Sequence, residues 1–240
     1  MPRARRYFIP GYVWHITQRC HEKNFLLKFQ RDRIFWQQLL FKAKKRFGLC
    51  VLNYIATSNH IHLLVKSQTE DDISKSMQLI AGETAGQYNL RKDRHGAFWQ
   101  DRYHATAVST EEHIFRCLVY IDLNMVRAGK VAHPKLWDVS GYHEIYQDRK
   151  RYRILDIDSL LSYANVKTLS QFRELHTGWI NANLSQETLK REPDWSEAIA
   201  IGDQQYVNKI QQLLDPSGFT RTIYHSGQRC VLRETREIYE

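Results

Sequence analysis

The chain has 240 residues, and 42% of them are hydrophobic, which is enough to bury a real core and excludes a wholly disordered chain. Lysine and arginine total 35 against 26 acidic residues, so the formal net charge is +9 and a polyanionic partner such as nucleic acid is favoured. A basic soluble protein without such a partner is the alternative that charge alone leaves open.

The cysteines and the first residues bear on the cellular compartment. Cys20, Cys50, Cys117 and Cys230 lie far apart and include no C-x-x-C pair, which argues against a structural zinc site and a disulfide framework. The opening segment MPRARRYFIPG lacks the apolar stretch of a signal peptide, and no apolar run is long enough to span a bilayer. We therefore expect a cytoplasmic protein with no membrane partner.

Strand and helix patterns alternate through the first half of the chain. Six segments follow in order: a strand over residues 12–17, a helix over 31–48, strands over 49–57 and 60–66, a helix over 71–92, and a strand over 97–109. Gly48 is a natural end for the first helix. The order β-α-β-β-α-β predicts an α+β fold of the ferredoxin-like, or RRM-like, kind, with an antiparallel sheet and helices on one face.

A third helix is predicted over residues 109–129, where STEEHIFRCLVYIDLNMVRAG has apolar residues at helical spacing and a glycine at its end. After residue 145 the pattern weakens into a charged stretch and short amphipathic segments. We therefore predict a main domain over residues 1–145 and a mostly helical extension over residues 146–240, with a tail near CVLRETREIY.

Two histidines stand out in the second middle strand, within SNHIHLLV. His60 and His62 are two residues apart, so their side chains project from the same face of a strand. Neutral imidazole is the commonest metal ligand in proteins, and paired ligands must face the same way. The alternative is a pair of surface or hydrogen-bonded histidines, and the short pattern alone favours that alternative.

The third helix carries a second group of polar residues. Tyr120 and Asn124 lie one turn apart, on a stripe that also includes Arg127 and is separate from the apolar stripe of the helix. Tyr120 alone would usually be a packing tyrosine, and Asn124 alone a surface amide. We expect this stripe to meet the two histidines across the sheet.

These residues resemble a known family. SNHIHLLV resembles the histidine–hydrophobic–histidine signature of HUH nucleases, and YIDLNMVRAGKV resembles the tyrosine helix of single-tyrosine transposases of the IS200/IS605 type. Within that group the chain is most similar to the REP-associated tyrosine transposases, which its opening segment MPRARRYFIPGYVWHITQRCHEKN and the segments FWQDRYHATAV and IGDQQYVNKI also resemble. The resemblance is good over residues 1–145 and loose beyond them.

The resemblance implies a role for each matching residue. His60 and His62 would be metal ligands, Asn124 would be the third ligand, and Tyr120 would be the nucleophile. The implied cofactor is a divalent cation, and Mn²⁺ suits two imidazoles and an amide at least as well as Mg²⁺ does. Tyr120 would attack a phosphodiester, form a 5′-phosphotyrosine and release a 3′-hydroxyl that can later reverse the step.

The sequence departs from the family pattern at three places. Cys20 stands where the family has a glycine, Thr57 and Ser58 replace a Met-Pro pair, and Met125 replaces a proline. None of these changes removes a reacting group.

The substrate implied by the resemblance is single-stranded DNA folded into REP-type hairpins, and the acting form would be a monomer or a homodimer. Basic, amide and aromatic side chains at the N-terminus and near the sheet ends suit phosphate contact, edge recognition and base stacking. The candidates are Arg3, Arg5, Arg6, Trp14, His15, Gln18, Arg19, Arg102, Tyr103 and His104. Some of the aromatic candidates are expected to lie in the core instead.

Two other functions remain open at this point. A non-catalytic, RRM-like nucleic-acid-binding protein would use the same fold without a metal or a covalent adduct. A metal-dependent phosphodiesterase would use water as the nucleophile and leave Tyr120 as a packing residue.

Overall fold

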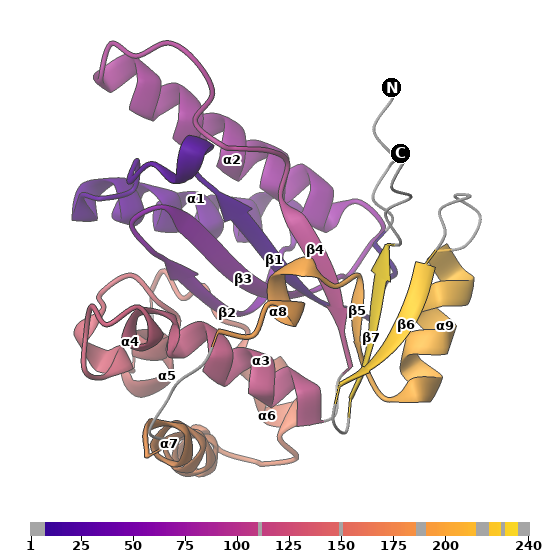
Figure 1. Ribbon diagram of the computed structural model, residues 1–240. Helices are drawn as coiled ribbons and strands as arrows, with labels where there is room; N and C mark the ends of the chain where they lie inside the picture. Colours follow the sequence, from indigo (N-terminus) through magenta and orange to yellow (C-terminus); the bar gives the residue numbers. More distant parts are fainter. Residues whose placement is uncertain are drawn as a thin grey trace.

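The structure is a computed structural model that describes residues 8–109, 112–148, 151–185, 191–214, 221–226 and 229–234. In this part of the chain, one sheet has the strand order β2-β3-β1-β4-β5-β7-β6 (Figure 1). Its strands are β1 (Val13–Arg19), β2 (Cys50–Ala56), β3 (His60–Lys66), β4 (His104–Val108), β5 (Ala200–Gly202), β6 (Arg221–Ser226) and β7 (Arg229–Glu234).

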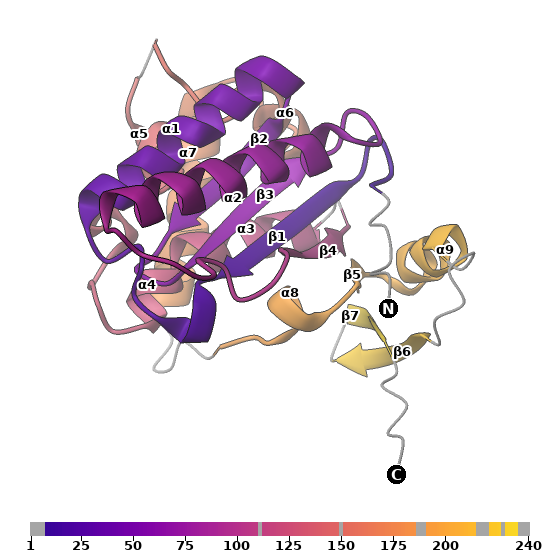
Figure 2. The same cartoon turned by 90° about the horizontal axis from the view of Figure 1, so that it is seen from above.

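Helices cover both faces of this sheet. They are α1 (Gln30–Phe47), α2 (Asp72–Arg91), α3 (Glu112–Asp122), α4 (Asn124–Arg127), α5 (Tyr142–Tyr146), α6 (Ile157–Tyr163), α7 (Leu169–Leu184), α8 (Asp194–Glu197) and α9 (Gln204–Leu214), with short 3-10 turns at His21–Lys23 and Pro134–Leu136. Helices α1 and α2 lie side by side over one face, and α3 lies against the other face (Figures 1 and 2). No helix in the described residues is long and apolar enough to cross a membrane.

The ferredoxin-like prediction is confirmed in the first half of the chain. Strands β2, β3, β1 and β4 are neighbours in that order, and each pair is antiparallel. Helix α1 buries Trp36, Leu40 and Ala43 completely and ends at Gly48, whose φ of +71° is the left-handed conformation that glycine adopts at low cost. The apolar spacing of this helix therefore predicts its buried face correctly.

Two of the predicted elements differ from the structure. The strand predicted over residues 97–109 is only β4, His104–Val108, because the aromatic residues before it fasten a loop to α2. Trp99 donates a hydrogen bond to the Ala81 carbonyl at 3.0 Å, and the Phe98 ring packs on the Tyr88 ring with centroids 5.0 Å apart. The helix predicted over residues 109–129 is divided into α3 and α4 by Leu123.

The extension is mostly helical in its described part, as predicted, but it also lengthens the sheet. Strand β5 pairs in parallel with β4, with Ala107 opposite Ala200, and β7 and β6 continue the sheet in antiparallel pairs. The segment predicted as a tail contains all of β7 except its first residue, Arg229. The division of the chain at residue 145 stays a prediction.

Helix α3, which carries Tyr120, is tied to the sheet by a buried amide. The Asn53 side chain on β2 donates hydrogen bonds to the Leu118 carbonyl at 3.1 Å and to Asp122 Oδ1 at 3.0 Å. Asp122 Oδ2 lies 2.9 Å from His176 Nε2 on α7, and all three polar side chains are buried. Because buried polar groups are costly unless paired, these bonds fix the position of α3 relative to β2 and α7.

Gly141 offers a test of how tightly Asn53 is held. A Cβ atom on Gly141 would lie 2.2 Å from Asn53 Oδ1, and Asn53 cannot move away without losing its bonds to α3. We expect Gly141→Ala to lower the free energy of unfolding by roughly 1–3 kcal/mol, measured by urea denaturation.

The matched control is Gly178→Ala on α7, where a Cβ atom meets nothing within 4 Å and the site is exposed. Alanine is the better helix former, so this change should be neutral or stabilising by up to about 1 kcal/mol. Equal effects of the two substitutions would contradict the packing that we assign to Gly141.

Candidate active site

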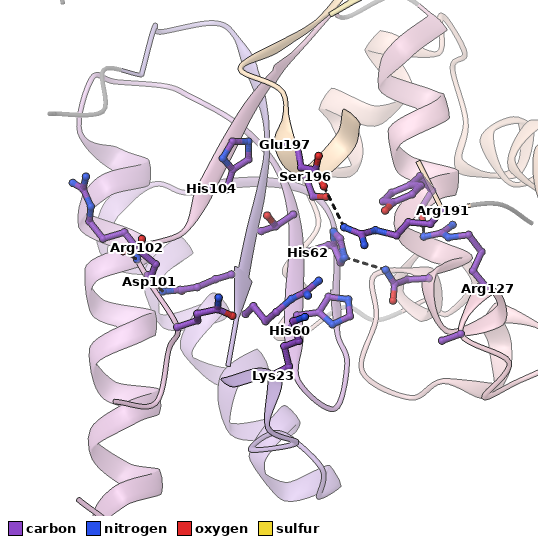
Figure 3. Close-up of a pocket in the computed structure, with 17 residues that line it drawn as sticks. Lys23, His60, His62, Asp101, Arg102, His104, Arg127, Arg191, Ser196 and Glu197 are labelled. Atoms are coloured by element: carbon purple, nitrogen blue, oxygen red, sulfur yellow. Dashed lines mark hydrogen bonds and ion pairs between the residues drawn. The ribbon is translucent and has the colours of Figure 1, made fainter. Parts of the chain in front are cut away.

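A cavity of about 500 Å³, lined mainly by polar and charged residues, opens at the end of β1 and the start of β3, between the sheet, the junction of α3 with α4, and α8 (Figure 3). Segments far apart in the sequence contribute to its wall. The lining residues are Thr17, Gln18, Arg19, Lys23, His60, His62, Gln100, Asp101, Arg102, His104, Tyr120, Asn124, Arg127, Ala128, Arg191, Ser196 and Glu197.

The sheet register places the two histidines of β3 in this cavity. His62 lies opposite Thr17 of β1, and His60 lies opposite Arg19, so all four side chains leave the same face of the sheet. The His60 and His62 ring centroids are 5.0 Å apart. The prediction that the pair shares a face and meets the tyrosine helix is confirmed, because Tyr120 and Asn124 line the same cavity.

The turn before β3 holds the His60 ring by its Nδ1 atom. Asn59 Oδ1 lies 2.8 Å from His60 Nδ1, and Thr57 Oγ1 lies 2.9 Å from it. An amide oxygen accepts hydrogen bonds only, so His60 carries its proton on Nδ1 and leaves Nε2 with a free lone pair. Thr57, one of the departures from the family pattern, thus supports this histidine: its hydroxyl also donates to the His60 carbonyl at 2.8 Å.

His62 is the more buried of the two, with 4% of its surface exposed. Its Nε2 lies 3.0 Å from Asn124 Nδ2, and its Nδ1 lies 2.9 Å from His15 Nε2 on the neighbouring strand. The Asn124 amide therefore faces His62 on the cavity side.

Burial keeps both imidazoles neutral. Desolvation, helped by the nearby Arg19 charge, lowers the pKa of His60 to about 4. Desolvation also holds the pKa of His62 well below its usual value, with a smaller effect from His60. Neutral imidazole is the form that binds a cation, so both side chains are ready to act as ligands at neutral pH.

The ring of Tyr120 on α3 is next to this pair, with its centroid 5.8 Å from that of His62. Burial raises the pKa of the Tyr120 phenol, and the Arg127 charge opposes that shift. The Arg127 guanidinium lies 3.9 Å from the Tyr120 ring centroid and donates a hydrogen bond to the Tyr120 carbonyl at 2.8 Å. Arg127 therefore both positions the tyrosine and favours its anionic form.

The break at Leu123 decides how α4 contributes. Asn124 is the first residue of α4 and Arg127 its last, and both side chains reach the cavity. Across the break at Leu123, the Arg127 guanidinium donates a hydrogen bond to the Tyr120 carbonyl. This carbonyl lies in the last turn of α3, where main-chain acceptors lack partners within the helix. The two short helices thus present nucleophile, amide and cation to one space.

The donors suit a divalent cation with open coordination positions. No group of three or more His, Cys, Asp or Glu side chains suited to a metal ion occurs in the described residues, so a cation would depend on His60, His62 and the amide of Asn124. Two unprotonated imidazole nitrogens and an amide oxygen are a mixed nitrogen and oxygen set, which Mn²⁺ accepts readily and Mg²⁺ less so.

The predicted DNA-binding residues fall into four groups, of which the buried pair Trp14 and His15 is described last. Gln18, Arg19, Arg102 and His104 line the cavity, and Tyr103 is half-buried, with its ring stacked on Phe8 at 6.3 Å between centroids. Arg3, Arg5 and Arg6 lie outside the described residues.

Trp14 and His15 need correction. Trp14 is 3% exposed and packs edge-on against Phe8 in the core, and His15 is completely buried beside His62. Neither side chain can contact DNA, because the sheet and its covering elements remove both from solvent.

Several cavity residues were not predicted as site residues. Lys23 comes from the 3-10 turn after β1, Gln100 and Asp101 come from the loop before β4, and Arg191, Ser196 and Glu197 come from the extension. Arg127 had a usable signal, because it continues the helical stripe of Tyr120 and Asn124. Arg191 had none, since its approach to the site depends on the fold of the extension.

The chain is similar to a known protein family over the part that carries the candidate nucleophile. Residues 10–124 match the family model described as "Transposase IS200 like", and this segment contains His60, His62, Tyr120 and, as its last residue, Asn124. This part of the chain is therefore similar to the IS200-like transposases.

Two solved structures are similar to the chain. One is described as "Structure of the REP associates tyrosine transposase bound to a REP hairpin"; it is 22% identical, with a TM-score of 0.51, and the match covers 64% of this chain and 90% of that one. It shows the same fold. The other is a putative transposase from Deinococcus radiodurans R1, 15% identical, with a TM-score of 0.36 and coverage of 54% and 98%. A comparison with curated proteins finds no significant match.

The buried histidines should make folding depend on pH. Burial lowers the pKa of His15 to about 3, and that of His62 also falls, whereas both groups would titrate near 6.5 in the unfolded chain. Below about pH 6.5 these histidines therefore bind protons in the unfolded state but not in the native state, so the free energy of unfolding decreases as pH falls. Between about pH 7 and pH 5 we expect the free energy of unfolding to drop by roughly 2 kcal/mol from His15, and His62 should add to the loss in the same direction.

Urea denaturation at several pH values in this window measures the effect. A free energy of unfolding that stays constant between these pH values would contradict the neutral state that we assign to the two rings.

Proposed function

We propose that the protein cleaves and rejoins single-stranded DNA through a covalent bond to Tyr120. The observation that supports this most directly is the placement of Tyr120 and Asn124 in one cavity with His60 and His62, with the Tyr120 ring centroid 5.8 Å from that of His62. A tyrosine that served only for packing would not need a polar cavity, a neighbouring cation and two neutral imidazoles beside it.

The proposed reaction is a transesterification at phosphorus. The Tyr120 hydroxyl oxygen attacks the phosphorus, the new oxygen–phosphorus bond forms, and the bond to the 3′-oxygen breaks. The phenol loses its proton and the departing 3′-oxygen gains one, leaving a 5′-phosphotyrosine and a free 3′-hydroxyl. Because the phosphoester bond is exchanged and not hydrolysed, a 3′-hydroxyl can reverse the step and join strands without another energy source.

Each side chain has a task in this scheme. His60, His62 and Asn124 would hold a divalent cation, which when bound polarises the phosphate oxygens. Arg127 stabilises negative charge on the phenol oxygen as the proton leaves. The four residues His60, His62, Tyr120 and Asn124 come from one chain, so a single copy carries a complete set.

A hairpin in single-stranded DNA is the substrate that we propose. Lys23, Arg19, Arg102, Arg127 and Arg191 surround the cavity, against two acidic lining residues, Asp101 and Glu197. This charge suits a strand whose phosphates pass on both sides of the cleavage point. The similar structure is described as bound to a REP hairpin, and we propose the same class of substrate here. A DNA substrate is consistent with the cytoplasmic location expected from the sequence.

A labelled hairpin oligonucleotide with single-stranded flanks tests the covalent step. In the presence of Mn²⁺ the native protein should form an adduct that survives denaturing electrophoresis, and Tyr120→Phe should form none. A 3′-end label should move with the protein and a 5′-end label should not, because the proposed bond is to the 5′-phosphate.

Tyr142→Phe is the matched control. Tyr142 is also a buried tyrosine next to α3, but it packs with Val119 and Leu123 on a cluster away from the cavity. It should keep adduct formation. Cleavage without any adduct would favour water as the nucleophile, binding without cleavage would favour a non-catalytic binding protein, and an adduct in Tyr120→Phe would exclude Tyr120 as the nucleophile.

Arg127→Gln tests the cation beside the nucleophile. Removing the charge raises the pKa of the Tyr120 phenol further and removes a contact worth up to about 2 kcal/mol, so we expect adduct formation to slow by roughly 10–30-fold. Arg116→Gln on α3 is the control, because its guanidinium pairs with Glu112 at 2.5 Å on the exposed side of the helix. Equal rates for native protein and Arg127→Gln would remove Arg127 from the scheme.

A further inference from the structure

His15 is a buried polar residue that the proposed reaction does not use directly. It lies on β1, is 0% exposed, and stacks on His62 with ring centroids 5.0 Å apart and an interplanar angle of 10°. Its two nitrogens have different partners: Nε2 is 2.9 Å from His62 Nδ1, and Nδ1 is 2.7 Å from the main-chain carbonyl of Trp195. The ring therefore connects α8 of the extension to a histidine of the active site.

The partners determine where each proton lies. A carbonyl oxygen only accepts, so His15 must carry its proton on Nδ1 and donate it to Trp195. The ring is completely buried and has no carboxylate among its hydrogen-bond partners, so the neutral form is favoured and its Nε2 is an acceptor. His62 must then donate through Nδ1, which leaves its Nε2 without a proton on the cavity side, where it faces Asn124.

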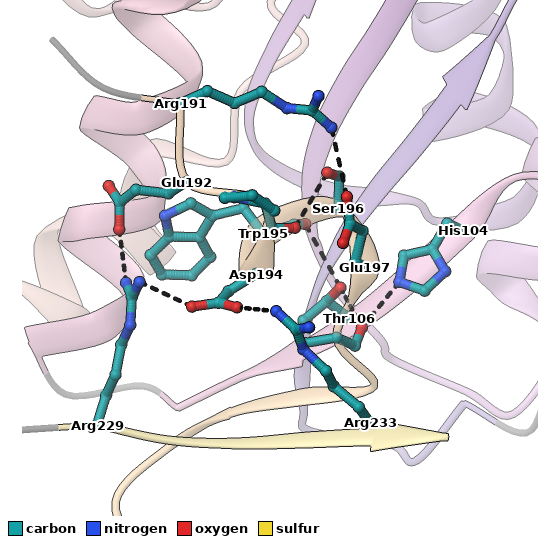
Figure 4. A network of polar contacts seen from close by, with 12 residues as sticks. His104, Thr106, Arg191, Glu192, Asp194, Trp195, Ser196, Glu197, Arg229 and Arg233 are labelled. Atoms are coloured by element: carbon teal, nitrogen blue, oxygen red, sulfur yellow. Dashed lines mark hydrogen bonds and ion pairs between the residues drawn. The ribbon is translucent and has the colours of Figure 1, made fainter. Parts of the chain in front are cut away.

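The segment around α8, which carries the Trp195 carbonyl, is held from two sides (Figure 4). From β7, Arg229 pairs with Glu192 at 2.6 Å and with Asp194 at 2.9 Å, and Arg233 also pairs with Asp194. From β4, the Thr106 hydroxyl donates to the Ala198 carbonyl at 2.6 Å, on the other side of α8.

The Trp195 side chain adds packing to these polar contacts. The Trp195 indole is completely buried, with its ring centroid 6.0 Å from that of Tyr120. The segment around α8 is thus fixed to the sheet, and its carbonyl cannot turn away from His15 without breaking several of these contacts.

We propose that His15 is a positioning residue for His62 and that the Trp195 carbonyl, through His15, selects the tautomer in which His62 offers Nε2 to a divalent cation. This inference rests on the proposed function, because it takes His62 to be a metal ligand. The extension then orients one of the metal ligands through His15, although it supplies none of the ligands itself. Removing such outer partners typically lowers metal affinity by roughly 10–100-fold.

The tautomer can be read without metal or DNA. Long-range proton–nitrogen NMR correlation of the imidazole rings in the full chain should show His62 protonated on Nδ1 and His15 protonated on Nδ1. In His15→Phe, which keeps a ring but loses both hydrogen bonds, His62 should gain a population protonated on Nε2. A native protein in which His62 carries its proton on Nε2 would overturn the inference.

Metal affinity provides the second readout. Titration with Mn²⁺ alone, followed by the electron paramagnetic resonance signal of the free ion, should show roughly 10–100-fold weaker binding in His15→Phe. His15→Gln keeps one donor and one acceptor and should restore affinity to within roughly threefold of the native protein, a rescue that a purely structural role would not give. His143→Phe is the control: that histidine also bonds a main-chain carbonyl, of Trp137 at 3.1 Å, away from the cavity, and its loss should leave Mn²⁺ affinity unchanged.

Asp194→Asn tests the contribution of the extension while His15 stays in place. It weakens the pairs with Arg229 and Arg233, so Mn²⁺ affinity should fall and His62 should show both tautomers. Native affinity and a single tautomer in Asp194→Asn would overturn the role of α8. A native chain that binds no Mn²⁺ would contradict the proposed metal site, whereas the wrong tautomer on His62 would contradict this inference alone.

Discussion

The antiparallel pairing of β1 with β3 is the constraint on which the site depends. It sets His62 opposite Thr17 and His60 opposite Arg19, and it brings His15 within hydrogen-bond distance of His62. Because side chains alternate along a strand, a shift of one residue would turn both imidazoles toward α1 and α2. The cavity, the neutral histidines and the approach of α3 all presuppose this one register.

The nucleophile reaches the histidines through a second set of contacts on the same face. Asn53 and Asp122 hold α3 against the sheet, and the break at Leu123 turns Asn124 and Arg127 toward the cavity. The two devices are independent: one is a strand register, and the other is a buried hydrogen-bond network. Their agreement in space brings a tyrosine, an amide and two imidazoles together although they are up to 64 residues apart in the chain.

Local periodicity was enough to predict the shared face of His60 and His62, the stripe of Tyr120 and Asn124, and the order of the first strands and helices. Long-range contacts were not predictable in this way. Strand β5 has three residues, and its pairing with β4 joins positions about ninety residues apart, so no local pattern marks it. The local sequence indicates only that His15 is a polar residue of a strand. Its role could not be predicted, because its partner Trp195 is 180 residues away.

The parallel pairing of β5 with β4 also changes which strand lies at the edge of the sheet. The segment that matches the family model ends at residue 124, well before β5. Within that segment β4 is therefore an edge strand. An edge strand offers unpaired main-chain donors and acceptors to any other strand it meets, which is a common route to aggregation. In this chain β5 pairs with β4 at Ala107 and Val108. The extension therefore covers β4 at these residues and makes β6 the edge strand on that side of the sheet.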